Sequence, residues 1–153
     1  MPRNVSRNAL GLASLAAILA VGAGTVTAQN VDAIKARKEI LKSMGKPTKE
    51  LAGMMKGEVP FDLSKVKQTL QLYQTQAPKL PPLFPPDSKT GGETEALPVI
   101  WDKKKDFEGR YAKLASDAKA AEATIKDEKS FKANIKEVVG NCGGCHKIYR
   151  EEK

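Results

Sequence analysis

Apolar residues recur at intervals of three and four positions in four segments of this chain, the spacing of one face of an α-helix. The C-terminal segment is the most regular. Its apolar residues and cysteines fall at steps of 4, 3, 4, 3 and 4, at Phe131, Ile135, Val138, Cys142, Cys145 and Tyr149. We predict a helix here, capped at its start by Asp127 or Ser130.

Two further stripes of the same period precede it. One begins near Pro98 and runs through Ile100, Phe107, Tyr111, Leu114, Ala118, Ala121 and Ile125. The other covers residues 63–77, and Asp62 stands where a helix N-cap is expected. Both stripes predict helices with one buried face.

The first segment has Val31, Ile34, Leu41 and Met44 on one face. Its helical spacing resumes at Leu51 after Gly45 and Pro47. Because proline has no backbone N–H, Pro47 predicts a kink or a short break in this helix.

One long stretch without helical spacing lies between residues 77 and 99. It holds six of the nine prolines, but also Leu80, Leu83 and Phe84. A flexible linker would rarely carry so many apolar residues, so we expect this crossover to pack over one end of the helices. No strand-like alternation of any length occurs. The sequence therefore predicts an all-α fold, an antiparallel up-down-up-down four-helix bundle with one long central connection.

Residues 1–28 have the features of a cleavable secretory signal peptide. Arg3 and Arg7 precede an uncharged stretch rich in Leu, Ala, Ile and Val, and Val26-Thr27-Ala28 resembles a cleavage site. An uncleaved membrane anchor is the alternative, but a span needs roughly 20 strongly apolar residues. We therefore expect export to the periplasm and a single mature domain, residues 29–153, with no membrane attachment after cleavage.

The net charge of the mature chain indicates which kind of partner it would bind. Cleavage would leave 24 basic and 18 acidic residues, a net charge of +6. A modest positive charge suits docking to acidic proteins, such as periplasmic redox partners. The lysines are spread along every segment and no nucleic-acid-binding module appears, which argues against nucleic acid as a partner.

The chemistry of the chain is concentrated in the motif Cys142-Gly143-Gly144-Cys145-His146, which holds its two cysteines and its one histidine. C-x-x-C-H is the attachment signature of c-type haem. A thioredoxin-like redox pair would need a βαβ context, and a structural zinc site needs four ligands where the chain has three Cys or His residues. We predict one haem c, covalently bound to Cys142 and Cys145, with His146 as axial ligand to the iron. Since seven residues follow His146, any ligand on the other side of the iron must come from earlier in the chain.

The motif continues as Lys147-Ile148-Tyr149-Arg150, and with a signal peptide and four helices it resembles that of the class II cytochromes c, best represented by the cytochromes c′. Further matching segments are Arg37, Lys56-Gly57-Glu58, Pro60-Phe61-Asp62 and Pro98-Val99-Ile100-Trp101. The resemblance covers nearly all of residues 30–153. It implies a haem-binding four-helix bundle and a homodimer formed through the first two helices.

The resemblance also implies that one residue of the first helix decides the coordination of the iron. Low-spin members have a methionine there, whereas high-spin members have an apolar residue and a five-coordinate iron. Counting back from Lys56-Gly57-Glu58 places this position at Leu41. Met44 is the rival ligand, although many high-spin members have a packing methionine there. A low-spin, six-coordinate electron carrier with Met44 as sixth ligand is therefore the alternative.

Four more side chains are expected near the haem. Arg37, one turn before Leu41, suits a haem propionate because a guanidinium binds a carboxylate through two hydrogen bonds. Lys38 would contribute less specifically. The resemblance implies that Phe84 walls the distal pocket and that Arg150, one turn after His146, lies on the proximal side.

These expectations define two functions. A five-coordinate iron behind Leu41 should bind small diatomic ligands, nitric oxide above all, whereas an electron carrier needs only a haem edge near the surface. A structural bundle without haem is a third possibility. With His146 assigned to iron, no Ser/His/Asp or paired-carboxylate arrangement is left to support an enzyme.

Overall fold

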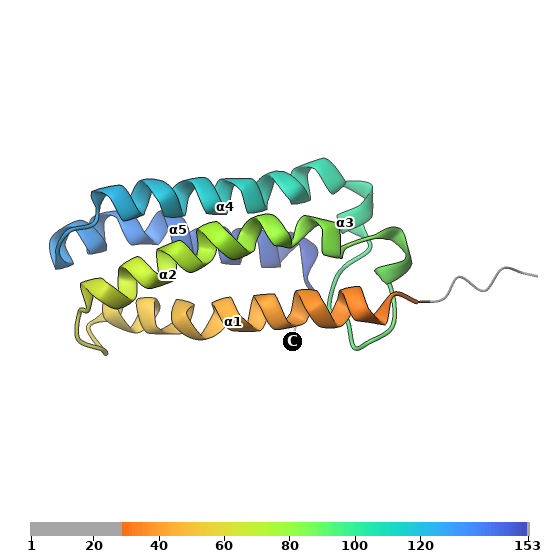
Figure 1. Ribbon diagram of the computed structural model, residues 1–153, viewed down its shortest axis with the longest axis horizontal. Coiled ribbons are helices and arrows are strands. Elements are labelled where there is room, and N and C mark those ends of the chain that lie inside the picture. The colour runs from red at the N-terminus through yellow and green to blue at the C-terminus, as the bar shows by residue number, and fades with distance from the viewer. Residues whose placement is uncertain (1–28, 153) are drawn as a thin grey trace, which may run out of the picture.

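The computed structural model describes residues 29–152, which form a bundle of four long helices (Figure 1). These are α1 (Val31–Lys56), α2 (Leu63–Gln76), α4 (Lys104–Thr124) and α5 (Glu128–Tyr149). The one-turn helix α3 (Val99–Asp102) precedes α4. Both α1 and α4 pack against α2 and α5, and successive long helices are antiparallel, so the predicted fold is confirmed. The predicted signal peptide lies outside the described residues.

Side-chain caps begin three of the helices, at the predicted positions for α2 and α5 and at Asn30, which was not predicted, for α1. Asn30 accepts a hydrogen bond from the Ala33 amide at the start of α1, and Asp62 accepts one from Lys65 at the start of α2. At the start of α5, Asp127 and Ser130 together form a capping box. The two residues predicted as alternative caps of this helix therefore act as a pair.

Of the kink or short break predicted at Pro47, the break does not occur. α1 runs from Val31 to Lys56 with Pro47 inside it. Met44 and Leu51, on either side of the proline, are both buried in the core, so packing stabilises the helix on both sides of Pro47. The helix ends at Gly57, whose φ of 75° is the left-handed conformation that glycine adopts at little cost.

The stripe that begins at Ile100 forms two helices instead of one. The backbone leaves the helical conformation at Lys103, between α3 and α4. The Trp101 indole donates to the carbonyls of Phe84 and Pro85, 3.1 Å away in both cases. This contact ties α3 to the crossover. It joins residues 16 and 17 positions apart, which helical spacing cannot predict.

The predicted apolar stripes form one core. All seven members of the stripe from Ile100 to Ile125 are buried, as are Phe131, Ile135, Val138 and Tyr149 of α5. No helix in the described residues is long and apolar enough to cross a membrane.

The Pro-rich crossover covers the end of the bundle at which α1 begins (Figure 1). It contains three 3₁₀ turns, η1 (Ala77–Lys79), η2 (Pro81–Leu83) and η3 (Pro86–Ser88). Leu80 and Phe84 are buried, which confirms that the crossover packs on the helices. Its last residues reach the C-terminal end of α5, where Ala96 and Arg150 form an isolated antiparallel bridge.

Candidate haem site

The motif lies within the last two turns of α5. Cys142 and Cys145 are half-buried, one turn apart, and Cys145 packs against the core. His146 is exposed and lies one turn beyond Cys142. A Cβ added at Gly143 would meet no atom within 4 Å, so packing within the protein does not require a glycine there.

Two sets of contacts hold the end of α5 that carries His146. The first comes from the crossover. The Leu97 amide donates to the Tyr149 carbonyl over 3.0 Å, and the Glu151 amide to the Glu95 carbonyl over 2.9 Å. Arg150 adds an ion pair with Glu95, with Nε 2.7 Å from the carboxylate. The predicted proximal arginine is therefore fixed beside the last turn of α5.

The second set comes from α4. The Tyr149 hydroxyl donates a short hydrogen bond to Asp106, which also accepts one from Arg110 over 2.8 Å. The Arg110 guanidinium lies 5.6 Å from the Tyr149 ring and 3.4 Å from the Gly144 carbonyl. These contacts orient the final turn of α5 relative to α4.

Burial dominates the electrostatics of the two thiols. It raises the pKa of Cys145 to about 11 and also raises the pKa of Cys142. Both thiols are therefore neutral at pH 7, as expected for side chains turned toward an apolar interior. At His146 desolvation lowers the pKa, with a further lowering from Arg150 that Glu95 opposes.

The pKa values of two buried tyrosines are raised in part by the cysteines. Burial raises the pKa of Tyr111, to which Cys145 contributes and which Arg37 opposes. Burial raises the pKa of Tyr73 to about 12, with a smaller contribution from Cys142. Cys142 also raises the pKa of Tyr111, so both cysteines act electrostatically on this tyrosine and Cys142 acts on Tyr73 as well.

The contacts of Tyr73 extend this arrangement along α1. Its hydroxyl lies 2.7 Å from that of Thr48, which also donates to the Met44 carbonyl over 2.7 Å. These hydrogen bonds join α2 to residues 44–48 of α1. Leu41 lies on α1 between Arg37 and Thr48, half-buried and packed against the core. Met44 is a core residue with 6% of its surface exposed.

Arg37 has partners that the sequence did not indicate. Its guanidinium is 2% exposed. Its two terminal nitrogens donate to the Leu83 carbonyl, to the Ser88 hydroxyl and carbonyl, and to the Thr94 hydroxyl, over 2.7 to 3.1 Å. All four acceptors belong to the crossover, 46 to 57 residues away. A propionate contact for Arg37 stays a prediction.

The two remaining predicted site residues also lie at the crossover. Lys38 is exposed and reaches the carbonyl of Glu93 over 3.2 Å and its carboxylate over 3.5 Å. Phe84 is buried, 4% exposed, with its ring centroid 4.7 Å from that of Phe107. Phe107 in turn contacts Tyr111. Phe84 is therefore connected through Phe107 to Tyr111, the tyrosine whose pKa Cys145 helps to raise.

The donor set fits haem c. Two neutral thiols one turn apart are the groups that form thioether bonds with the vinyl substituents, and the adjacent imidazole is an iron ligand. The described residues contain no group of three or more His, Cys, Asp or Glu side chains able to hold a metal ion.

Sequence reasoning missed the residues that support this site from a distance. Ser88, Thr94, Glu95 and Lys104 bind other site residues through pairs that are 20 or more positions apart. Helical spacing carries no signal for such pairs. The aromatic residues Tyr73 and Tyr111 were expected in the core and are there, but their proximity to the thiols was not predicted.

Comparison with known proteins identifies the family. The family model described as Cytochrome C′ matches residues 32–150. A cytochrome c′ of Rhodopseudomonas palustris is 50% identical over 144 residues, which are 94% of this chain and 98% of that protein. A cytochrome c-556 of Agrobacterium fabrum is 36% identical over 78% of this chain and 82% of its own length.

Solved structures agree. The structure of cytochrome c′ from Rhodopseudomonas palustris has a TM-score of 0.78 and 53% identity, and the match covers 80% of this chain and 98% of that one. The sequence match, the bundle and the paired thiols beside an imidazole lead to one conclusion: this chain belongs to the cytochrome c′ family and carries covalently bound haem c.

Proposed function

We propose that the chain is an exported, periplasmic haem protein with a five-coordinate iron that binds small diatomic ligands, above all nitric oxide. The position of Leu41 carries this proposal. It lies on α1 one turn after Arg37, half-buried and packed against the core that Cys145 also contacts, so its side chain is suited to cover the haem face opposite His146. A leucine has no atom that can coordinate iron.

Two polar side chains one and two turns from Leu41 along the same face of α1, Arg37 and Thr48, support a preference for nitric oxide over oxygen. Bound oxygen is stabilised by a hydrogen-bond donor in the distal pocket. Arg37 donates all four of its hydrogen bonds to the crossover, and the Thr48 hydroxyl is shared between Met44 and Tyr73. Both groups are already engaged, so the pocket that we propose is apolar. Haem supplies the iron, and the chain supplies its covalent anchors, one axial ligand and this apolar cover.

Electron transfer with Met44 as the sixth ligand is the second candidate. Met44 follows Leu41 by three residues and is turned into the core. The relatives include proteins named cytochrome c′ and others named cytochrome c-556, so the family does not decide between the two functions. We favour the first because Met44 packs with other core residues on both sides of Pro47, as a filler would.

The proposed function also includes export to the periplasm, acidic redox partners and a homodimer. Cleavage after Ala28 would release the domain of residues 29–153 into the periplasm. Its net charge of +6 would favour acidic redox partners, and pairing through α1 and α2 would give a homodimer. The mass of the exported protein tests the cleavage site, and sedimentation tests the oligomeric state.

Titration with nitric oxide tests the function. The reduced holoprotein is expected to bind one nitric oxide per haem, with a complete change of its absorption spectrum at stoichiometric ligand. A spectrum that does not change under excess nitric oxide would contradict the proposed function and favour the electron carrier.

A further inference from the structure

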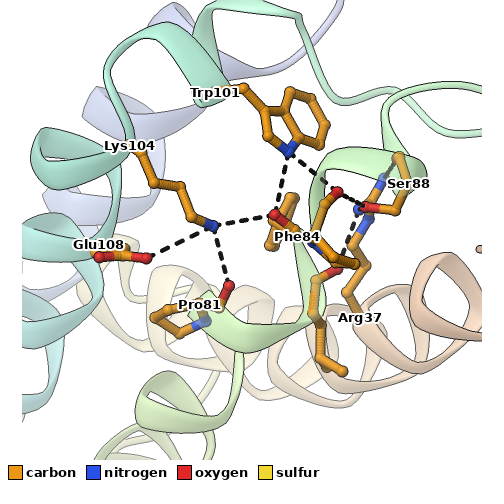
Figure 2. A network of polar contacts seen from close by, with 9 residues as sticks. Arg37, Pro81, Phe84, Ser88, Trp101, Lys104 and Glu108 are labelled. Atoms are coloured by element: carbon orange, nitrogen blue, oxygen red, sulfur yellow. Dashed lines mark hydrogen bonds and ion pairs between the residues drawn. The ribbon is translucent and has the colours of Figure 1, made fainter.

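We infer that Arg37 and Lys104 form a clamp that positions Phe84 and the Pro-rich crossover, and that this clamp limits how fast a small ligand reaches the haem pocket. The inference rests on the proposed function for its second half. Its first half concerns contacts between α1, α4 and the crossover, which Figure 2 shows around Phe84.

Arg37 holds the crossover from α1. Its four hydrogen bonds end on residues of η2, of η3 and of the segment that follows them. The guanidinium carbon also lies 4.3 Å from the centre of the Phe84 ring, within the range of a cation–π contact. Because the charge is buried, any movement of the crossover away from Arg37 would leave buried donors without acceptors.

Lys104 holds the same residue from α4. Its ammonium donates to the carbonyls of Pro81 and Phe84, 3.1 Å away in both cases, and lies 5.8 Å from the Phe84 ring. Trp101 donates to the same Phe84 carbonyl. Two cations from two helices therefore converge on one phenylalanine, on its ring and, for Lys104, on its backbone oxygen as well (Figure 2).

Phe84 connects the clamp to the haem site. Its ring packs on Phe107, and Phe107 packs edge-on against both Tyr111 and Tyr149. Cys145 packs against the core cluster that contains Tyr111, and Tyr149 is three residues beyond His146. The crossover thus closes the end of the bundle next to the predicted haem position, and its release would open a path into the aromatic cluster.

Arg37→Lys and Lys104→Met remove the clamp contacts from α1 and from α4, respectively. Lysine at position 37 keeps the charge but cannot make four hydrogen bonds in this geometry. Methionine at position 104 keeps the stem and removes the donors. Lys42→Met and Lys105→Met are matched controls, since both lysines are exposed on the same two helices. Within residues 29–152, neither lysine has a hydrogen bond or ion pair with the crossover.

Three measurements on the reduced holoproteins test the inference. Rebinding of carbon monoxide after flash photolysis should be faster by about tenfold in each clamp variant, equivalent to about 1.4 kcal/mol. Trypsin should cleave faster after Lys79 and Lys89, which are exposed in the crossover. The fluorescence of Trp101, the one tryptophan of the chain, should change. Both controls should match the wild type in all three.

The outcomes distinguish the alternatives. Unchanged proteolysis and fluorescence in both clamp variants would overturn the clamp. Faster proteolysis with an unchanged rebinding rate would overturn the control of ligand entry. A shifted reduction potential in Arg37→Lys, with proteolysis unchanged, would assign Arg37 to a propionate instead. A wild-type protein that binds no carbon monoxide would refute the proposed function together with the control of ligand entry, while proteolysis would still decide the clamp.

The double variant provides an internal check. Since both cations act through Phe84, their effects on rebinding should not be additive, and the double variant should resemble the single ones. Fully additive effects would show that Arg37 and Lys104 act independently and would overturn a shared clamp.

Discussion

Leu41 is the residue of α1 on which the proposed coordination of the iron depends. It is half-buried and packs against the core. Replacement by alanine would remove apolar volume from the proposed distal side. We expect Leu41→Ala to bind nitric oxide faster than the wild type in stopped-flow measurements, because the cover over the iron is smaller.

The control for this substitution is Ile40→Ala. Ile40 is also half-buried and also packs against the core, but it points to a different side of α1. Both variants should lose stability, by about 1–2 kcal/mol for half-buried aliphatic residues. Equal nitric oxide rates in the two variants would remove Leu41 from the pocket.

The cysteines give a second prediction at this scale. Replacement of both Cys142 and Cys145 by serine should yield a chain whose haem separates on denaturation, because no thioether bond remains. Each single serine variant should keep its haem through one bond. Mass spectrometry of the denatured proteins checks this, and haem retained by the double variant would contradict the assigned anchors.

Arg37 shows where reasoning from single residues ends. It was expected to bind the carboxylate of a propionate, and in the structure both of its terminal nitrogens bind oxygen atoms of the protein. Which oxygens it binds depends on the path of a crossover about fifty residues away. Spacing along one helix carries no information about that path.

At the level of elements, the helix caps contribute measurably to the free energy of unfolding. Asp62 accepts a hydrogen bond from Lys65 at the start of α2. We expect Asp62→Ala to lower the free energy of unfolding by about 1 kcal/mol, because one amide at the helix start loses its acceptor. Urea unfolding measures this. Asp62→Asn should retain most of the stability, and an alanine variant as stable as the wild type would show that the cap is dispensable.

The helices themselves were predictable because each buries one continuous face. The stripes of α2, α4 and α5 appear in the sequence at the positions that the structure buries. Two local predictions failed for the same physical reason. Packing on both sides of Pro47 keeps α1 continuous, and the contact of Trp101 with the crossover accompanies the break before α4. In each case tertiary contacts override a local preference.

At the scale of the molecule, carboxylates that join the helices set the response to acid. Hydrogen bonds from Gln74 and Gln71 of α2 lower the pKa of Glu122 on α4. Hydrogen bonds from Tyr149 and then Arg110 lower the pKa of Asp106. A carboxyl group whose pKa is lower in the folded state stabilises that state at pH values above its unfolded pKa, which is about 4. This stabilisation is lost as the pH falls through the pKa of the folded state.

We therefore expect the urea midpoint to be steady from pH 7 to pH 5 and to fall between pH 4 and pH 3. Glu122→Gln should weaken this dependence, because glutamine does not titrate. Glu151→Gln, at the exposed C-terminal end, is the control and should leave the dependence unchanged. A midpoint that does not vary down to pH 3 would show that these carboxylates stabilise the folded state no more than the unfolded one.

The central claim concerns the iron, which should have one axial ligand from the chain, His146, and an apolar cover provided by Leu41. The electron paramagnetic resonance spectrum of the oxidised holoprotein, recorded for the wild type and for Met44→Ala, tests it most directly. We predict a high-spin signal from both proteins, since Met44 is a packing residue. A low-spin signal from the wild type that becomes high-spin in Met44→Ala would contradict the claim and identify Met44 as the sixth ligand.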